Sequence, residues 1–160
     1  MANILVDKTG HARLADFSLL TIISDATNGL SSTTSMQGGT ARWMSPELIA
    51  PRFGLENSRP TKPSDCSALG MVIYETISGH FPFHEDRDMA VFVKVLDGKR
   101  PAQEAHFTDS LWKTLELCWE AQSGDRPSIE GVLRCLENEP TTSSAGCRNG
   151  GGWRWFGPFG

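Results

Sequence analysis

The chain has 160 residues with a formal net charge of −4 at pH 7, and 39% of its residues are hydrophobic, which suits one domain with one packed core. The charge is mild and contains no basic run, so nothing indicates a nucleic-acid partner. No apolar run is long enough to span a membrane and no signal-peptide pattern opens the sequence, so we expect a cytoplasmic or nuclear protein that does not bind membranes.

The first predicted element is a β-hairpin. Two short apolar stretches at 4–6 and 12–15 flank a polar turn at 7–10, which ends on a glycine. From 19 to 39 the periodicity fades and small polar residues dominate, which predicts a long surface loop rich in hydroxyls. Loops of that length inside a compact domain are usually functional or disordered. The hydroxyls leave two interpretations open, regulatory phosphorylation or a loop that is simply well hydrated.

After this loop the sequence predicts helices. A short helix is expected at 48–50, ending at Pro51, and a long helix at 66–77, with Ser64 and Asp65 as its N-cap residues. The long helix is apolar nearly all round, so we expect it to form the axis of the core. Three further helices are predicted at 88–96, 111–119 and 129–136.

The last predicted helix begins after Ser128, its expected cap, and carries a regular apolar repeat. Its apolar residues repeat at i, i+3, i+4 and i+7, namely Ile129, Val132, Leu133 and Leu136. Beyond Pro140 the sequence is low in complexity, with a Ser/Thr run followed by a stretch rich in glycine and tryptophan. We therefore expect residues 138–160 to form a disordered tail that buries little surface.

The four cysteines indicate a reducing compartment. Cys66, Cys118 and Cys135 fall inside apolar helical patterns, Cys147 lies in the tail, and no C-x-x-C spacing occurs. We interpret the first three as reduced thiols of the core rather than as a metal site or a disulfide framework.

The most specific motifs lie between Ala15 and Glu47. This stretch opens with Asp-Phe-Ser at 16–18 and closes with Gly-Thr-Ala-Arg-Trp-Met-Ser-Pro-Glu at 39–47. It resembles the activation segment of a protein kinase, which runs from D-F-G to A-P-E. The closing motif is close to the G-T-x-R-W-M-A-P-E of tyrosine-kinase-like Ser/Thr kinases. Ser18 departs from the family's glycine, which narrows the backbone freedom at that position.

Further motifs extend the resemblance over residues 2–137. The segment 3–7 resembles the one that follows the kinase catalytic loop, 65–70 resembles the D-x-x-S-x-G that opens a buried helix, and 124–128 matches a D-R-P segment. The resemblance implies the large lobe of the protein-kinase fold, truncated before its catalytic loop. The predicted fold class is therefore mainly α with a short N-terminal β-hairpin.

The resemblance also implies the cofactors and the residues that hold them. In the family, the equivalents of Asn3 and Asp16 hold Mg²⁺ against the phosphates of ATP, and Leu5 and Ala15 would lie under the adenine ring. Without the surrounding motifs, Asn3 would be interpreted as an ordinary asparagine of a turn and Asp16 as a surface aspartate at the end of a strand. The hairpin between them and the Pro-Glu motif downstream favour the metal-binding interpretation.

The same resemblance assigns roles in substrate binding and in the core. Thr40 would approach the substrate hydroxyl, with Arg42 and Trp43 in the loop that binds the protein substrate. Asp65 would cap backbone amides, either of the catalytic loop or of its own helix.

One long-range contact is also implied. Glu47 and Arg126 would form a buried ion pair that joins the Pro-Glu anchor to the later helices.

Parts of the family's catalytic machinery are not found before Asn3. No Gly-rich loop, no V-A-I-K lysine and no H-R-D precede it, so the general-base aspartate is missing. The first functional hypothesis is an ATP-dependent Ser/Thr protein kinase domain that is inactive as this chain alone. The alternative is a non-catalytic, pseudokinase-like interaction module, with a partner protein covering the apolar surface where the small lobe would dock.

Overall fold

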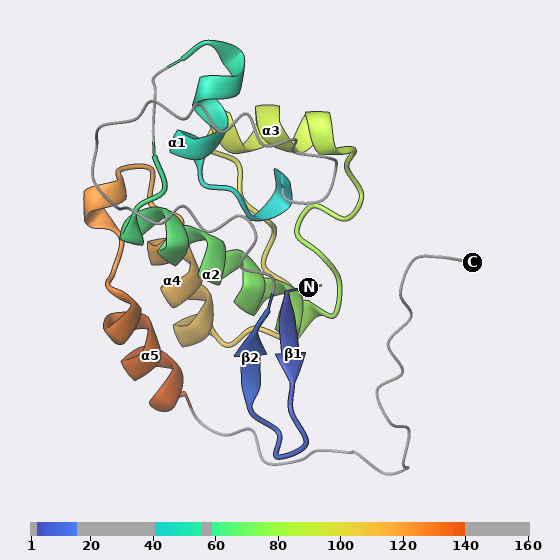
Figure 1. Ribbon diagram of the computed structural model, residues 1–160, viewed down its shortest axis with the longest axis vertical. Coiled ribbons are helices and arrows are strands. Elements are labelled where there is room, and N and C mark those ends of the chain that lie inside the picture. Colours follow the sequence, from blue (N-terminus) through green and yellow to red (C-terminus); the bar gives the residue numbers. More distant parts are fainter. Residues whose placement is uncertain (1–2, 16–40, 56–58, 140–160) are drawn as a thin grey trace.

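The computed structural model describes residues 3–15, 41–55 and 59–139 (Figure 1). The described part is mainly helical and has one two-stranded antiparallel sheet, which confirms the predicted fold class. The helices are α1 (Pro46–Ile49), α2 (Lys62–Ser78), α3 (Asp88–Leu96), α4 (Asp109–Cys118) and α5 (Ile129–Glu137). Short 3₁₀ turns are η1 (Ala41–Trp43), η2 (Ala50–Phe53) and η3 (Ser123–Asp125).

Helix α2 forms the axis of the helical body, as its all-round apolar character predicts. Helix α4 packs along α2, and α5 packs on α4, while α1, η2 and α3 lie together at the other end of the molecule (Figure 1). The larger apolar core joins α2, α4 and α5, with Met71, Leu115 and Val132 fully buried. A smaller core between α1 and α3 is built from Ile49, Val91, Phe92 and Val95.

Side chains at the C-terminal end of α4 pack closely on the backbone of α2 at Gly70. A Cβ atom added there would lie 2.7 Å from Nε1 of Trp119 and 2.9 Å from Cβ of Cys118. Carbon atoms do not approach such neighbours without a shift of one of them. Glycine at this position therefore leaves the room that the side chains of Cys118 and Trp119 occupy.

The N-terminus of α2 differs from the prediction. The helix begins at Lys62, and Thr61 is its N-cap residue, with a side-chain oxygen that accepts a hydrogen bond from the backbone N–H of Ser64. Ser64 Oγ in turn accepts from the backbone N–H of Thr61, which completes a capping box. Asp65 lies within the first turn and its side chain is exposed, so its assignment as a helix cap is wrong.

Other helix ends agree with the sequence more closely. Helix α3 has the predicted bounds, Thr108 caps α4 by accepting from the N–H of Leu111, and Ser128 caps α5. The predicted helix at 48–50 has the wrong bounds, because α1 covers Pro46–Ile49 and the chain continues through Pro51 in η2. A proline in the first turn of a helix needs no N–H donor there.

The apolar face of α5 is only partly buried. Of its four apolar residues, Val132 is buried and Leu136 is half-buried, whereas Ile129 and Leu133 are 43% and 53% exposed. The helix contacts α4 along one edge of this face, and the other edge meets solvent.

The cysteines divide between core and surface. Cys66 and Cys118 are buried free thiols, as predicted, but Cys135 is exposed on α5, so its assignment to the core is wrong. Cys147 lies outside the described residues.

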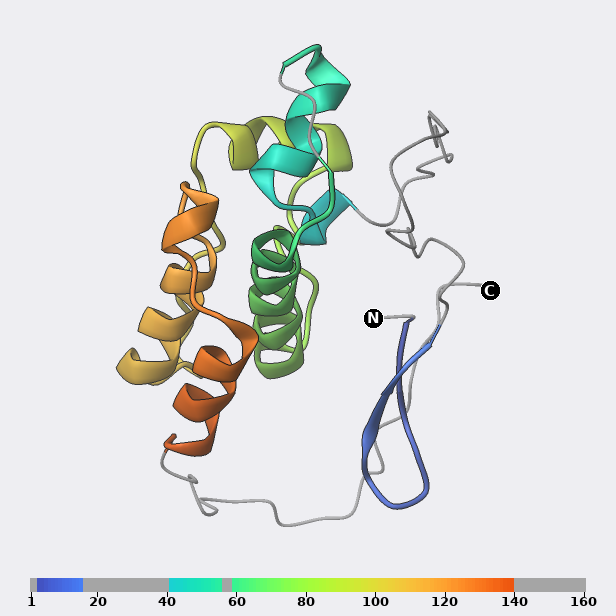
Figure 2. The same ribbon diagram turned by 60° about the vertical axis from the view of Figure 1, so that its left-hand side comes forward.

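The hairpin pairs β1 (Ile4–Val6) with β2 (Ala12–Leu14) in antiparallel register, with Ile4 opposite Leu14. Figure 2 shows it standing to one side of the helices. Each strand contacts mainly the other strand. The side chains of Leu5, Val6 and Leu14 are largely exposed. The hairpin is thus held mainly by its own ladder and turn.

Candidate functional site

The turn of the hairpin is organised by Asp7. Its Oδ1 accepts hydrogen bonds from the backbone N–H groups of Thr9 and His11, at 2.9 and 3.0 Å, and from Thr9 Oγ1 at 2.6 Å. Its Oδ2 pairs with the guanidinium of Arg13 at 2.9 Å. The hydroxyl of Thr9, the N–H of His11 and Arg13 together lower the pKa of Asp7 to about 2. This role of Asp7 is not among the predictions from the sequence, although an aspartate at the first position of a turn is the usual signal for it.

The open end of the hairpin carries the residues expected to hold Mg²⁺. The backbone N–H of Ala15 donates to the carbonyl oxygen of Asn3 at 2.8 Å, so the ladder continues past both strands. The side chain of Asn3 is exposed at this end. Asp16 directly follows Ala15 in the sequence but lies outside the described residues, as does Ser18.

The donor chemistry of this pair suits a hard cation. An amide oxygen and a carboxylate are the ligands that Mg²⁺ takes in proteins, usually with phosphate oxygens and waters. Within residues 3–15, 41–55 and 59–139, no group of three or more His, Cys, Asp or Glu side chains could hold a metal ion. The described part of the chain therefore offers one of the two expected ligands, Asn3.

The residues expected under the adenine ring lie on the same hairpin. Leu5 pairs with Arg13 across the sheet and is 57% exposed, and Ala15 is half-buried. An exposed leucine on a thin sheet is an apolar contact surface without a partner in the described part of the chain.

The segment expected to bind substrate is fixed to the helical body through Arg42. The guanidinium lies 4.6 Å from the ring centre of Phe81, in a cation–π contact. Its hydrogen-bond acceptors are the carbonyl oxygens of Pro82, Phe83 and Asp86, and it forms an ion pair with the carboxylate of Asp88 at 2.9 Å. The Arg42 side chain is therefore occupied in holding the loop before α3 rather than presented to solvent. Thr40, the residue expected to approach the substrate hydroxyl, lies outside the described residues.

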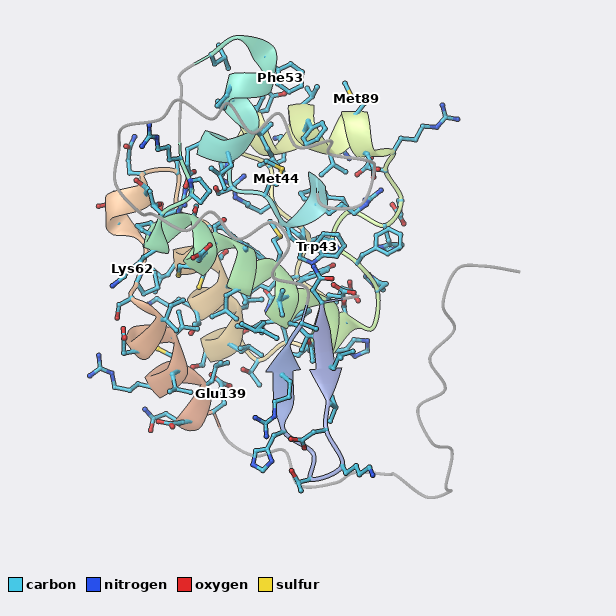
Figure 3. The ribbon with its side chains drawn as sticks, viewed as in Figure 1. Trp43, Met44, Phe53, Lys62, Met89 and Glu139 are labelled. Carbon is cyan, nitrogen blue, oxygen red and sulfur yellow. The ribbon has the colours of Figure 1, made fainter. Side chains whose placement is uncertain are left out.

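Trp43 anchors the same segment at a second point. Its indole N–H donates to Glu75 Oε2 on α2 at 3.0 Å, and its ring packs against the larger core while remaining partly exposed. Figure 3 shows Trp43 and Met44 lying over the middle of the helical body. Arg42 and Trp43 thus attach one short turn to two different elements.

The structure brings Glu47 and Arg126 into contact. Arg126 Nη1 donates to Glu47 Oε1 at 2.6 Å and Nη2 to Oε2 at 2.9 Å, which is the bidentate geometry of a strong arginine–carboxylate pair. The remaining donors reach backbone carbonyls, Nη1 that of Pro63 at 3.0 Å and Nε that of Glu120 at 2.9 Å. One buried guanidinium therefore links α1, the start of α2 and the end of α4.

The electrostatics of this pair favour the charged carboxylate. Burial alone would raise the pKa of Glu47, but the hydrogen bonds from Arg126 and its positive charge outweigh burial and hold the pKa below its ordinary value. Glu47 remains ionised at neutral pH, and the Pro-Glu motif is fixed to the later helices.

Two further polar contacts were not identified from the sequence. Arg100 donates to the carbonyl oxygens of Trp119 and Val95, which joins the ends of α4 and α3. Tyr74 Oη donates to Glu104 Oε1 at 2.7 Å, and burial followed by this bond raises the pKa of the phenol. Of the residues in these two contacts, only Arg100 lies in a motif that the sequence makes recognisable, the segment Gly-Lys-Arg-Pro at 98–101.

Among the described residues, no helix is both long and apolar enough to cross a membrane.

Comparison with known proteins agrees with the resemblance to protein kinases that the sequence motifs indicate. A family model described as protein tyrosine and serine/threonine kinase matches residues 1–136.

Individual relatives cover most of this chain. The protein named "Probable serine/threonine-protein kinase" from Dictyostelium discoideum is 30% identical over 139 residues, which is 86% of this chain and 14% of the relative. The serine/threonine-protein kinase mos of Patiria pectinifera is 31% identical over 141 residues, 85% of this chain and 38% of the relative. The inactive tyrosine-protein kinase RYK of Caenorhabditis elegans is 35% identical over 98 residues, 61% of this chain and 16% of the relative.

The chain thus spans between 14% and 38% of the length of these three proteins. The match of the family model over most of the sequence is sufficient to assign the family. The chain belongs to the protein tyrosine and serine/threonine kinase family.

Proposed function

We propose that this chain is the large-lobe part of a Ser/Thr protein kinase, which holds the segment that binds the protein substrate. The observation that carries the proposal is the fixation of residues 41–47 at both ends, by Arg42 on the loop before α3 and by the Glu47–Arg126 pair. A segment that must present a substrate in one geometry needs such anchors, because positioning supplies much of the rate in phosphoryl transfer.

The cofactors proposed are ATP and Mg²⁺, by family membership. When bound, ATP supplies the phosphoryl group and Mg²⁺ neutralises the charge of its phosphates. Asn3 and Asp16 would hold the metal, Leu5 and Ala15 would contact the adenine, and Thr40 would orient the substrate hydroxyl. The turn around Asp7 supports this role by keeping β1 and β2 paired, and Asn3, Leu5 and Ala15 lie on these strands or directly beside them.

We expect these 160 residues alone to be inactive. The sequence contains no H-R-D, whose aspartate accepts the proton of the substrate hydroxyl, and no V-A-I-K lysine. The test is transfer of labelled phosphate from Mg-ATP to casein and to the chain itself. We expect transfer no greater than that of the Asp16→Ala variant, which controls for contaminating kinases. Transfer by the wild-type chain that the variant lacks would contradict the expectation.

The exposed hairpin supports a second candidate, a non-catalytic interaction module that binds a partner protein. Leu5, Val6 and Leu14 present apolar surface that soluble monomers normally cover. Titration of the chain with Mg-ATP, followed by NMR of the hairpin amides, separates the two candidates. Shifts at Leu5 and Ala15 that saturate support the kinase, whereas no change up to millimolar nucleotide favours the module.

A further inference from the structure

The hairpin leaves the outer edge of each strand without a neighbouring strand in the described part of the chain. The backbone N–H of Asp7 donates to the carbonyl oxygen of His11 at 2.9 Å, and such hydrogen-bonded pairs recur at every second residue of an antiparallel ladder. Positions 3, 5 and 7 therefore turn their N–H and C=O groups towards β2, whereas Ile4 and Val6 turn theirs outward. Val6 is 72% exposed, so the outer edge of β1 is open at that residue.

The outer edge of β1 is complementary to itself. When a second copy lies antiparallel to it with Leu5 opposite Leu5, Ile4 of each copy faces Val6 of the other. Both residues have outward N–H and C=O groups to exchange, and pairs of β-branched side chains stabilise neighbouring strands. At each end of this contact Asp7 faces the uncharged Asn3 of the other copy. The edge thus offers a second copy matching backbone groups without placing like charges opposite each other.

The outer edge of β2 lacks this complementarity. There the outward groups belong to Ala12 and Leu14, so the same arrangement places Arg13 opposite Arg13. Arg13 is bonded to Asp7, which offsets its charge, but two long polar side chains would lose water at the centre of the contact. Ala12 adds only a methyl group. The edge of β1, with a leucine at its centre, is therefore the more favourable one.

We propose that two copies of this chain pair along the outer edges of β1 and form one four-stranded antiparallel sheet in the order β2–β1–β1–β2. Side chains of directly opposite residues share one face of a sheet, so this sheet joins Ile4, Val6, Ala12 and Leu14 of both copies into one apolar face. The inference rests on the second candidate function, for which it names a second copy as the partner, and it does not require nucleotide binding.

The hairpin gains stability from this pairing because it has little other support. A two-stranded hairpin is marginally stable in water, and β1 and β2 contact mainly each other. A second copy would satisfy the outward backbone groups of β1 and cover part of Leu5, which is 57% exposed. Strands of three residues bury far less than the roughly 1,000 Å² of a stable complex. We therefore expect a weak, reversible dimer.

Sedimentation velocity of the full chain from about 10 µM to about 1 mM measures the dimer over the range expected of a small interface. Val6→Pro removes the N–H that faces the second copy and no bond to β2, so the dissociation constant should rise roughly tenfold. Leu14→Pro removes the outward N–H of β2 and is the matched control, which should dimerise like the wild type. Equal affinities of the two variants would overturn the proposal. So would a wild-type chain that stays monomeric, whose β1 edge would then be left to a strand of a different protein.

Mixed isotope labelling tests the contact without a substitution. In an equal mixture of ¹³C-labelled and unlabelled chains, isotope-filtered NMR should show contacts between Ile4 of one copy and Val6 of the other. Contacts between Ala12 of one copy and Leu14 of the other, or no contact between copies at the hairpin, would overturn the proposal. The titration with Mg-ATP is made on dilute, monomeric chain, so its outcome for the proposed function is obtained separately from that of the dimer.

Discussion

Arg126 places a positive charge inside the helical body, and the surrounding groups satisfy its donors. The carboxylate of Glu47 accepts two hydrogen bonds, and the carbonyls of Pro63 and Glu120 accept the others. A buried charge is tolerated when it is paired and hydrogen-bonded in this way. The site therefore depends on the whole set of acceptors rather than on the ion pair alone.

The first prediction concerns this residue. Arg126→Ala leaves the Glu47 carboxylate half-buried without its cation and frees two backbone carbonyls, so we expect a loss of about 3–5 kcal/mol in the free energy of unfolding. Urea denaturation followed by circular dichroism measures it. Arg134→Ala, an exposed arginine on α5, is the control and should change stability by less than about 0.5 kcal/mol. Equal losses in both variants would show that Arg126 has no special role.

At the scale of elements, the sequence predicts the bounds and caps of helices more accurately than it predicts which residues are buried. The bounds of α3 and the caps Thr108 and Ser128 follow from neighbouring residues, so the sequence contains them. The sequence does not determine the start of α2, because Thr61, Ser64 and Asp65 are all good cap residues within five positions. The reciprocal hydrogen bonds of Thr61 and Ser64 decide between them.

The exposure of α5 could not be read from its periodicity. An apolar repeat shows which face of a helix prefers burial, but the width of the partner surface is a tertiary property. For the same reason Cys135, which stands in an apolar pattern, was wrongly assigned to the core.

The second prediction concerns the contact between α2 and α4. Gly70→Ala places a methyl group against Trp119 and Cys118, which should cost about 1–3 kcal/mol and exceed the gain of up to about 1 kcal/mol from better helix propensity. Thermal unfolding measures the net loss. Gly131→Ala in α5 is the matched control, because its nearest neighbour would be 3.6 Å away, and it should be neutral or stabilising. A Gly70→Ala chain as stable as Gly131→Ala would refute the close packing.

Taken whole, the described chain consists of a hairpin and a helical body that share few contacts. Motifs far apart in the sequence allowed Glu47 and Arg126 to be paired before the structure, because family resemblance supplies long-range information that periodicity lacks. The metal and substrate assignments of Asp16 and Thr40 stay predictions, since both residues lie outside the described part. The arrangement predicts that the hairpin can melt without the helices.

The third prediction uses the pH dependence of the turn. The pKa of Asp7 in the folded hairpin is about 2, below its ordinary 3.8, so its hydrogen bonds stabilise the turn above pH 3.8 and are lost as the pH falls towards 2. NMR should show the amide resonances of Thr9 and His11 moving together with the Asp7 carboxyl over this range.

The control for this prediction is made at neutral pH. Asp7→Ala should remove the cross-strand contacts between Ile4 and Leu14 while the helical circular dichroism stays unchanged. A simultaneous loss of helical signal would mean that hairpin and helices unfold as one unit.

The contacts of Arg42 determine how strongly salt affects the attachment of residues 41–43 to the loop before α3. Carbonyl oxygens, which carry no net charge, accept three of its hydrogen bonds, and Asp88 is the one carboxylate bonded to it. Salt screens attraction between exposed charges but affects hydrogen bonds to partly buried neutral acceptors less. The joint between residues 41–43 and the loop before α3 should therefore hold in concentrated salt, where a joint made of surface ion pairs would loosen.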